Sequence, residues 1–182
     1  MTRDKARVPL VSQDELPDDY RYLFDEEVLG ELNLFRSMGH VPRAMQAYMR
    51  HGTALWNAGD LSTRERELAI LAVARTVRSR YEWHQHVELG REAGISSEEL
   101  AALARGDDCA LSTREQAIVR YASAVAAGAV TDPLFEAAEA VTDTETVVGL
   151  TMLAGHYLLT ARVLDSLAVP IDGGEFVGWC PE

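Results

Sequence analysis

Apolar residues recur in this chain at the three- and four-residue spacing of α-helices, and polar capping signals divide the pattern into segments. The clearest segment opens with Ser62-Thr63-Arg64-Glu65, a capping box in which a hydroxyl and the Glu three residues later satisfy the free amides of a helix start. The residues that follow are apolar on nearly every face. The pattern therefore predicts a central, buried helix through residues 68–73.

Two further capping boxes, at residues 96–99 and 112–115, mark other helix starts. Gly94 and Gly128 mark helix ends, and Asp132-Pro133 is typical of a cap followed by proline in the first turn. No stretch alternates between apolar and polar residues, so no strand is predicted and the fold class is all-α. The predicted helices cover about residues 62–78, 80–93, 112–128 and 145–167, with the first two forming an antiparallel pair.

The sequence Leu-Ser-Thr-Arg-Glu occurs twice, starting at Leu61 and at Leu111. One interpretation is an internal duplication of a helical unit. The other is two unrelated helices with similar caps, because the likeness fades after five residues. The sequence leaves both interpretations open.

Polarity divides the chain into an arm, a helical region and a tail. Residues 1–25 are polar and interrupted by proline, which predicts an arm (residues 1–30) lying on the surface or on a neighbouring subunit. Residues 31–170 hold the predicted helices and form one domain. In the tail, residues 171–182, the aromatic residues Phe176 and Trp179 follow two glycines and are expected to dock on a partner chain.

The charge balance narrows the range of partners. The 182 residues carry a formal net charge of −12, which argues against nucleic acid and anionic membranes. No run of about 18 apolar residues is present, so we expect no membrane span. The first residues lack the apolar core of a signal peptide, so we expect a cytoplasmic protein.

The segment from Ser79 to His86 is the best candidate for chemistry. Ser79, Glu82 and His86 stand at i, i+3 and i+7, so they share one face of a helix. Glu82 and His86 are four residues apart, close enough to touch and to move a proton. The apolar residues around them place this polar set against a core.

Each candidate also has a plain structural interpretation. Ser79 can cap the second helix, and Glu82 can face solvent and pair with a neighbouring arginine. His86 can be a core histidine bonded to a backbone carbonyl. Glu67, near the start of the preceding helix, can be a carboxylate favoured by the helix dipole.

Metal binding is another use for these side chains. Glu82 and His86 have the i, i+4 spacing of ligands on a helix, and Glu67 offers a third ligand. His84-x-His86 instead suits a strand, where alternate residues share a face. We therefore expect no metal and no cofactor, and we expect His84 at the surface or at an interface.

The two cysteines, Cys109 and Cys180, are 71 residues apart and form no Cys-x-x-Cys motif. In a reducing cytoplasm such cysteines are free thiols, and we expect no disulfide and no redox role.

From Glu67 to Glu99 the chain resembles the carboxymuconolactone decarboxylase and alkylhydroperoxidase D superfamily. The peroxidase branch has a Glu, a Cys twelve positions later, a second Cys three later and a His four after that. On this chain the Glu is Glu67 and the His is His86, while Ser79 and Glu82 occupy the two thiol positions. Ala93-Gly94-Ile95-Ser96 also resembles the family, with weaker likeness at Asn33–Arg36 and near Tyr157.

The resemblance implies an all-α, alkylhydroperoxidase D-like helical bundle, with residues 31–170 as its domain. It also implies a homo-oligomer, with a trimer or hexamer first, and pockets near the subunit contacts. The site residues that it implies are Glu67, Ser79, Glu82 and His86.

Acid–base chemistry on a small molecule is the leading functional hypothesis. It is a cofactor-free lyase, a decarboxylase or isomerase, acting on a small carboxylated lactone or enol acid, with His86 as general acid or base tuned by Glu67 or Glu82. A thiol peroxidase is disfavoured because both thiol positions are replaced. A non-catalytic oligomeric binding protein is the third alternative. Four arginines are candidates to hold a substrate carboxylate: Arg36, Arg75, Arg78 and Arg80.

Overall fold

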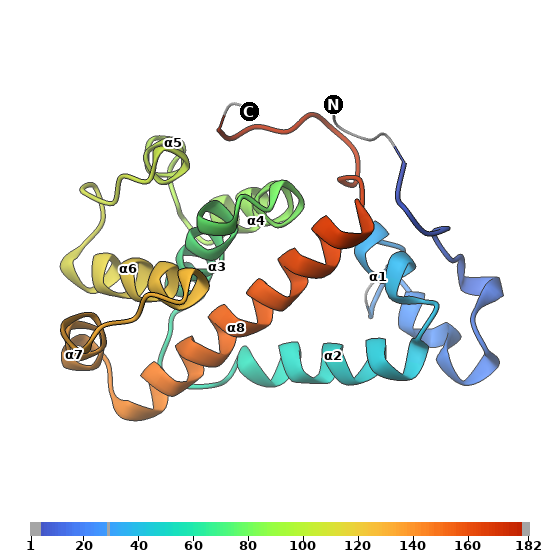
Figure 1. The fold of residues 1–182 in the computed structure, drawn as a ribbon, viewed down its shortest axis with the longest axis horizontal. Coiled ribbons are helices and arrows are strands. Elements are labelled where there is room, and N and C mark those ends of the chain that lie inside the picture. Colours follow the sequence, from blue (N-terminus) through green and yellow to red (C-terminus); the bar gives the residue numbers. More distant parts are fainter. Residues whose placement is uncertain (1–4, 29, 180–182) are drawn as a thin grey trace.

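The computed structural model describes residues 5–28 and 30–179. These residues form helices and no strands, so the predicted all-α class is confirmed (Figure 1). Two short 3-10 helices come first, Gln13–Glu15 and Asp18–Phe24. The α-helices are α1 (Asn33–Met38), α2 (Pro42–Leu55), α3 (Thr63–Val77), α4 (Arg80–Glu92), α5 (Ser97–Arg105), α6 (Thr113–Ala127), α7 (Asp132–Val141) and α8 (Thr144–Leu167).

Helix α3 begins at the predicted capping box. The Ser62 hydroxyl accepts a hydrogen bond from the Glu65 amide, and the Ser62 amide donates to the Glu65 carboxylate at 2.9 Å. Every residue from Glu65 to Ala74 is buried, because α3 is packed against α4, α5, α6 and α8. The helix ends at Arg78, whose positive φ of 58° turns the chain sharply. Helix α4 therefore starts almost at once and packs back on α3.

Helix α7 begins one residue earlier than its sequence signal predicts. Thr131, not Asp132, is the N-cap residue, and Asp132 and Pro133 lie inside the first turn. Both residues suit that position, since proline lacks an amide that the first turn does not need and a carboxylate is favoured by the helix dipole. The predicted end of the preceding helix is confirmed, because Gly128 is its left-handed C-cap.

Three apolar clusters form the core. The first joins α3, α6 and α8 and includes Ile70, Ile118 and Leu150. The second joins α3, α4 and α5 around Trp83. The third gathers the arm, α1, α2 and the end of α8 around Met45. Helix α8 thus contributes to two clusters, and it crosses the molecule between them (Figure 1).

The arm packs on its own chain. Leu16, Leu23 and Phe24 are buried in the third cluster, and the Arg7 amide donates a hydrogen bond to the Leu167 carbonyl at 2.7 Å. Of the two predicted locations, the structure therefore places the described arm residues on the surface of the same subunit.

The described part of the tail packs on its own chain, and docking of its aromatic residues on a partner chain stays a prediction. Phe176 and Trp179 are partly buried against the second cluster, and the Trp83 indole donates a hydrogen bond to the Val177 carbonyl at 2.9 Å. The physical reason is local: a buried indole N–H needs an acceptor, and the tail backbone supplies it.

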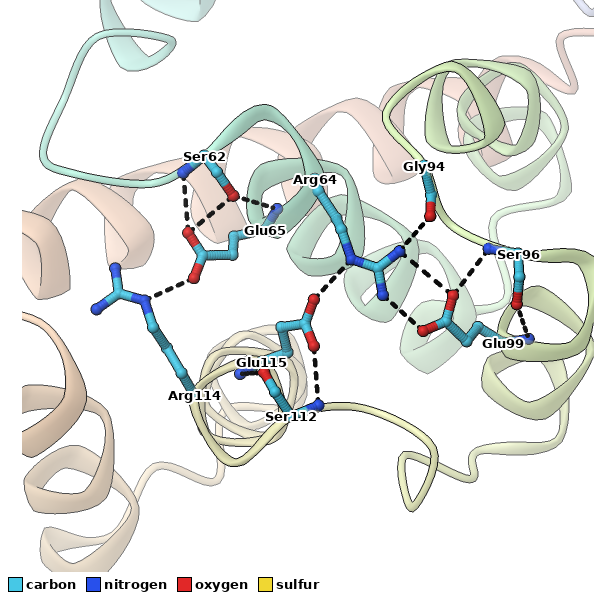
Figure 2. A network of polar contacts seen from close by, with 9 residues as sticks. All are labelled: Ser62, Arg64, Glu65, Gly94, Ser96, Glu99, Ser112, Arg114 and Glu115. Carbon is cyan, nitrogen blue, oxygen red and sulfur yellow. Dashed lines mark hydrogen bonds and ion pairs between the residues drawn. The ribbon is translucent and has the colours of Figure 1, made fainter.

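Two arginines link the three capping boxes into one network (Figure 2). Arg64 binds the Glu115 carboxylate at 2.7 Å and the Glu99 carboxylate at 2.6 Å. Arg114 binds the Glu65 carboxylate at 2.6 Å. The Arg of each Leu-Ser-Thr-Arg-Glu copy therefore pairs with the Glu of the other copy. This reciprocity, together with the matched lengths of α3 and α6 at 15 residues each, favours the duplication interpretation.

Helix α8 is long and apolar enough to cross a bilayer by length and composition, with a mean hydropathy of 1.4 over its most apolar window. Half of that window is buried inside the protein. The helix contacts α2, α3, α4, α6 and α7, which is the environment of a core helix.

Candidate active site

A cavity of about 290 Å³ lies between α1, α2, α4 and α8. Its walls are mainly apolar, with side chains such as Phe35, Met49 and Leu89. Its polar side chains come from three helices that are distant in sequence: Tyr48, Glu82, Gln85, His86, His156 and Tyr157. Of the four predicted site residues, Glu82 and His86 line this cavity, whereas Glu67 and Ser79 do not.

Glu67 lies behind His86 and bonds to it. His86 Nδ1 and Glu67 Oε2 are 2.7 Å apart, and Glu67 is only 1% exposed. Because a carboxylate oxygen accepts, we assign the proton of the neutral ring to Nδ1. The other ring nitrogen, Nε2, forms no hydrogen bond with any described residue and is the one left for a molecule in the cavity.

Tyr157 of α8 packs against the histidine. Its ring meets the His86 ring edge-on, with centroids 5.0 Å apart. Burial, reinforced by the charge of Glu67, raises the pKa of the Tyr157 hydroxyl well above its ordinary value. Tyr157 is therefore a neutral phenol and a potential hydrogen-bond donor at the cavity wall.

Glu82 is the most unusual side chain of the site. It is 2% exposed, and neither carboxyl oxygen forms a hydrogen bond with a described residue. Burial raises the pKa of Glu82 well above its ordinary value, and it outweighs the lowering effect of the nearby Ser79 hydroxyl, while the charge of Asp165 adds to the rise. Glu82 is therefore a buried carboxylic acid that keeps its proton to a higher pH than an exposed glutamate does.

These positions correct the expected Glu82–His86 contact. The i, i+4 spacing allows the contact, yet the Nδ1 atom of His86 bonds to Glu67 of the neighbouring helix. The alternative of a solvent-facing Glu82 is also wrong, because its side chain is turned into the protein. Helical spacing fixes which residues share a face, but the packing of α3 against that face decides the partner.

Ser79 occupies the N-cap position of α4 but does not cap it through its side chain. It is fully buried, and its hydroxyl has no hydrogen-bond partner among the described residues. His84 is partly buried and lies near Gly174 of the tail. Neither residue lines the cavity.

The wall formed by α2 and α8 holds a polar group that sequence reasoning missed. Tyr48 and Thr160 have hydroxyl oxygens 2.5 Å apart, and Thr160 donates to the His156 carbonyl at 2.8 Å, so Tyr48 donates to Thr160. Burial raises the pKa of Tyr48 to about 12. The sequence signal was present, since His156 and Tyr157 are polar residues in the middle of the most apolar helix.

His156 is held as a neutral ring. Its Nδ1 atom is 3.0 Å from Nδ1 of His51, so one of the two rings donates and the other accepts. Its ring is stacked on Tyr48, with centroids 4.4 Å apart. Burial, followed by the effect of His51, lowers the pKa of His156 to about 4.

No arginine or lysine is among the residues that line the cavity, which corrects the expectation that an arginine holds a substrate carboxylate there. Arg36 binds the Val11 carbonyl of the arm, and Arg75 binds the Ala104 carbonyl and stacks on a tail tryptophan. Arg80 lies over Phe176. Arg36 of α1 thus binds the arm, whereas Arg75 and Arg80 contact aromatic residues of the tail.

The described residues contain no group of three or more His, Cys, Asp or Glu side chains placed to hold a metal ion. The dyad of Glu67 and His86 is thus the centre of the candidate chemistry. It joins a buried carboxylate to an imidazole whose second nitrogen is available, which is an arrangement suited to moving one proton.

Comparison with known families now adds to this geometry. The sequence profile of the carboxymuconolactone decarboxylase family matches residues 42–124, which include Glu67, Ser79, Glu82 and His86. Residues 42–124 therefore resemble this family, and the helical fold is similar to that of an alkylhydroperoxidase D-like core. No curated protein matches the sequence.

Two solved structures have a fold similar to that of this chain. One is the alkylhydroperoxidase AhpD core of an uncharacterized peroxidase-related protein from Ralstonia eutropha JMP134, with a TM-score of 0.78, 21% identity and 92% of each chain covered. The other is a cysteine-to-alanine variant of the debrominase Bmp8 in complex with 2,3,4-tribromopyrrole, with a TM-score of 0.70, 12% identity and 78% of each chain covered. At these identities the likeness concerns the fold.

Among the described residues, no cysteine lines the cavity, where the thiol chemistry of the peroxidase branch would need one. Cys109 is exposed, and it does not line the cavity. A hydrogen bond and the negative charge of Asp107 raise the pKa of the Cys109 thiol, which disfavours the reactive thiolate. Cys180 lies outside the described residues.

Proposed function

We propose that this protein is a cofactor-free enzyme that transfers a proton to or from carbon, as a decarboxylating lyase or an isomerase of a small lactone or enol acid. The observation that carries the proposal is the Glu67–His86 bond beside an apolar cavity. Glu67 orients the imidazole and holds its Nδ1 proton, and Nε2 of His86 exchanges a proton with the substrate.

In the decarboxylation, the bond between the carboxyl carbon and the adjacent carbon breaks. Its electron pair forms an enolate, and carbon dioxide leaves. The protonated His86 ring then gives its Nε2 proton to the carbon, and solvent restores the proton to the ring. In the isomerisation, neutral His86 takes a proton from one carbon next to a carbonyl and returns it to another.

The residues around Glu67 and His86 support both the decarboxylation and the isomerisation. An apolar cavity without Arg or Lys favours a step in which a carboxylate loses its charge as carbon dioxide. The neutral hydroxyl of Tyr157 and the neutral acid Glu82 are suited to stabilise an enolate oxygen. One structural neighbour, Bmp8, is complexed with 2,3,4-tribromopyrrole, a small flat ring, which supports a small-molecule role for the fold.

A thiol peroxidase is the weaker candidate. Its chemistry needs a low-pKa thiolate and a second, resolving thiol, whereas Ser79 and Glu82 stand at the two family positions. A non-catalytic binding protein would retain the same cavity and show no turnover. Both alternatives differ from the proposal in their response to changes at His86.

The decisive variant is His86→Gln, with His84→Gln as the matched control on the same helix. Wild type is first screened on small lactones, β-keto acids and enol acids by carbon dioxide release and ultraviolet absorbance. On any accepted substrate, His86→Gln should lower kcat by about 10²–10⁴, since that is the usual contribution of general acid–base catalysis. His84→Gln should change kcat little, and equal rates for wild type and His86→Gln would remove His86 from the mechanism.

A further inference from the structure

The carboxyl group of Glu82 forms no hydrogen bond of normal geometry with the described residues, although the Ser79 hydroxyl lies near it. Both oxygens are shielded from solvent, and neither forms a hydrogen bond with a described residue. Buried polar groups in folded proteins are nearly always paired, so an unpaired carboxyl group at a cavity wall indicates a partner that arrives with a ligand. The adjacent Ser79 hydroxyl is also unpaired, one helical turn before Glu82.

The charges around Glu82 restrict what that ligand is. Apart from histidine, the residues that line the cavity include no cation, and they include the acid Glu82. Glu67 lies behind His86 and Asp165 contributes a further negative charge near Glu82. The buried Arg66 is engaged by Trp56, whose carbonyl and ring it contacts. A second negative charge on a ligand would have no counter-ion in this cavity.

The other residues that line the cavity favour a flat, apolar ligand. The cavity of about 290 Å³ is bordered by the rings of Phe35, Tyr48 and Trp56 and by aliphatic side chains. That volume suits a single five- or six-membered ring with small substituents, at the lower end of typical ligand pockets.

We propose that Glu82 carries its proton in the resting enzyme and donates it as a hydrogen bond to a carbonyl or carboxyl oxygen of the substrate, so that the cavity selects small cyclic molecules that are uncharged or carry one negative charge. The inference rests on the proposed function, because it takes this cavity as the substrate site. As an enolate forms, the O–H bond of Glu82 can break while an O–H bond forms on the substrate oxygen, which leaves Glu82 as a carboxylate. The reverse transfer restores both groups.

The proposal separates substrates by charge. A cyclic enone or lactone places its carbonyl oxygen against the Glu82 proton without burying a charge. A monocarboxylate buries one charge and receives a charge-assisted hydrogen bond in return. A dicarboxylate buries a second charge without a partner, which is strongly unfavourable.

Infrared difference spectroscopy tests the proton on Glu82 directly. The full chain and Glu82→Gln are compared at neutral pH, with Glu88→Gln, on the exposed side of α4, as the matched control. Wild type and Glu88→Gln should both show the carbonyl band of a protonated carboxylic acid, and Glu82→Gln should lack it. Addition of cyclohexenone should shift that band, because the acid gains a hydrogen-bond acceptor. Absence of the band from wild type, or a band that bound cyclohexenone leaves unchanged, would overturn the proposal.

Calorimetry with a matched ligand series tests the selection. The ligands are cyclohexenone, cyclohexenecarboxylate and cyclohexenedicarboxylate, which share one ring and differ in charge. The dicarboxylate should bind at least about tenfold more weakly than the enone. Glu82→Leu, which removes the donor, should weaken enone binding by about tenfold, whereas Glu82→Gln retains an amide donor and should stay within about threefold. Equal or tighter binding of the dicarboxylate, or no binding by any of the three, contradicts the selection.

The two levels of the hypothesis fail in different experiments. If His86→Gln retains full turnover while the infrared and binding results hold, the proposed proton transfer is wrong and the ligand class stands. If His86→Gln loses turnover while the acid band is missing, the proton transfer stands and the role of Glu82 is wrong.

Discussion

The two copies of the Leu-Ser-Thr-Arg-Glu unit make the same helix start and bury mainly apolar side chains, but only the first also buries an acid–base pair. In the first copy, α3 and α4 bury Glu67, Glu82 and His86. In the second copy, α6 and α7 bury apolar residues, and the position that matches Glu67 is Ala117. A shared cap thus fixes where a helix begins, whereas the residues inside the helix decide whether it carries a site.

The difference follows from what each copy faces. Helix α4 borders a cavity together with α1, α2 and α8, whereas α7 packs on α6 and α8 through Ala138. Polar side chains are tolerated in the first copy because Glu67 and His86 satisfy each other and the cavity offers room for a ligand. The helices of the second copy, α6 and α7, therefore support α3 and α8.

The largest expected effect comes from removing the buried carboxylate of Glu67, which the second copy lacks. Glu67→Gln should lower kcat/KM by about 10²–10⁴, because the imidazole loses the carboxylate that orients its ring and accepts its Nδ1 proton. The matched control, Ala117→Gln in the second copy, should retain wild-type kinetics. Steady-state assays on an accepted substrate measure both. A control that lost as much activity would show that the second copy also carries catalytic residues.

Substitution of Arg64 and Arg114, each of which binds the glutamate of the other copy, tests whether the two copies stabilise each other. Arg64→Ala and Arg114→Ala should each lower the free energy of unfolding by about 1–3 kcal/mol, since each removes partly buried ion pairs and frees a capping glutamate. Denaturant titration followed by circular dichroism gives the values. Because the ion pairs belong to one network, the double variant should lose less than the sum of the two single losses. Strict additivity would mean that the copies are independent.

Assembly is the next test, because α8 supports both copies and leaves one face uncovered. Val148, Met152 and Leu159 lie on that face and are 51%, 47% and 53% exposed. We propose a homo-oligomer, with a trimer or hexamer first, that covers this face. Light scattering should give a multiple of 20.0 kDa for wild type and a shift toward monomer for Met152→Glu, whereas Ala137→Glu, at an exposed position of α7, should not change the mass. A monomeric wild type at micromolar concentration would refute the assembly.

The smallest effect is a pH dependence that belongs to the first copy alone. Burial raises the pKa of Glu82 in the folded state above its ordinary value of 4.5. As pH rises from that value toward the raised pKa, the unfolded chain loses the proton first, so the stability contributed by protonated Glu82 declines. Asp165 from α8 contributes to this shift, and Tyr48 and Tyr157, which also face Glu82, keep their protons over that range.

Glu82→Gln isolates this contribution. Unfolding of wild type and variant is measured from mildly acidic to mildly alkaline pH, and the difference in their free energies should grow in favour of the variant as pH rises. Parallel profiles would show that Glu82 does not titrate with a raised pKa.

The local sequence determined the helices and the candidate residues of this protein. Capping boxes, glycine C-caps and apolar spacing act within a few residues, so the starts at Ser62, Ser96 and Ser112 and the end at Gly128 follow from the sequence alone. The same locality indicated that Ser79, Glu82 and His86 share one face of α4. It also indicated an all-α fold, because no segment has the alternation of a strand.

Only the tertiary structure decided which side chains meet. His86 bonds to Glu67 of another helix, and the cavity wall is completed by α2 and α8, where His51 and His156 are 105 positions apart. Such contacts depend on how helices from distant parts of the chain pack around one space, and helical periodicity holds no information on that arrangement. Glu82 is the plainest case, since its sequence suggested a salt bridge, whereas its burial raises its pKa well above the ordinary value.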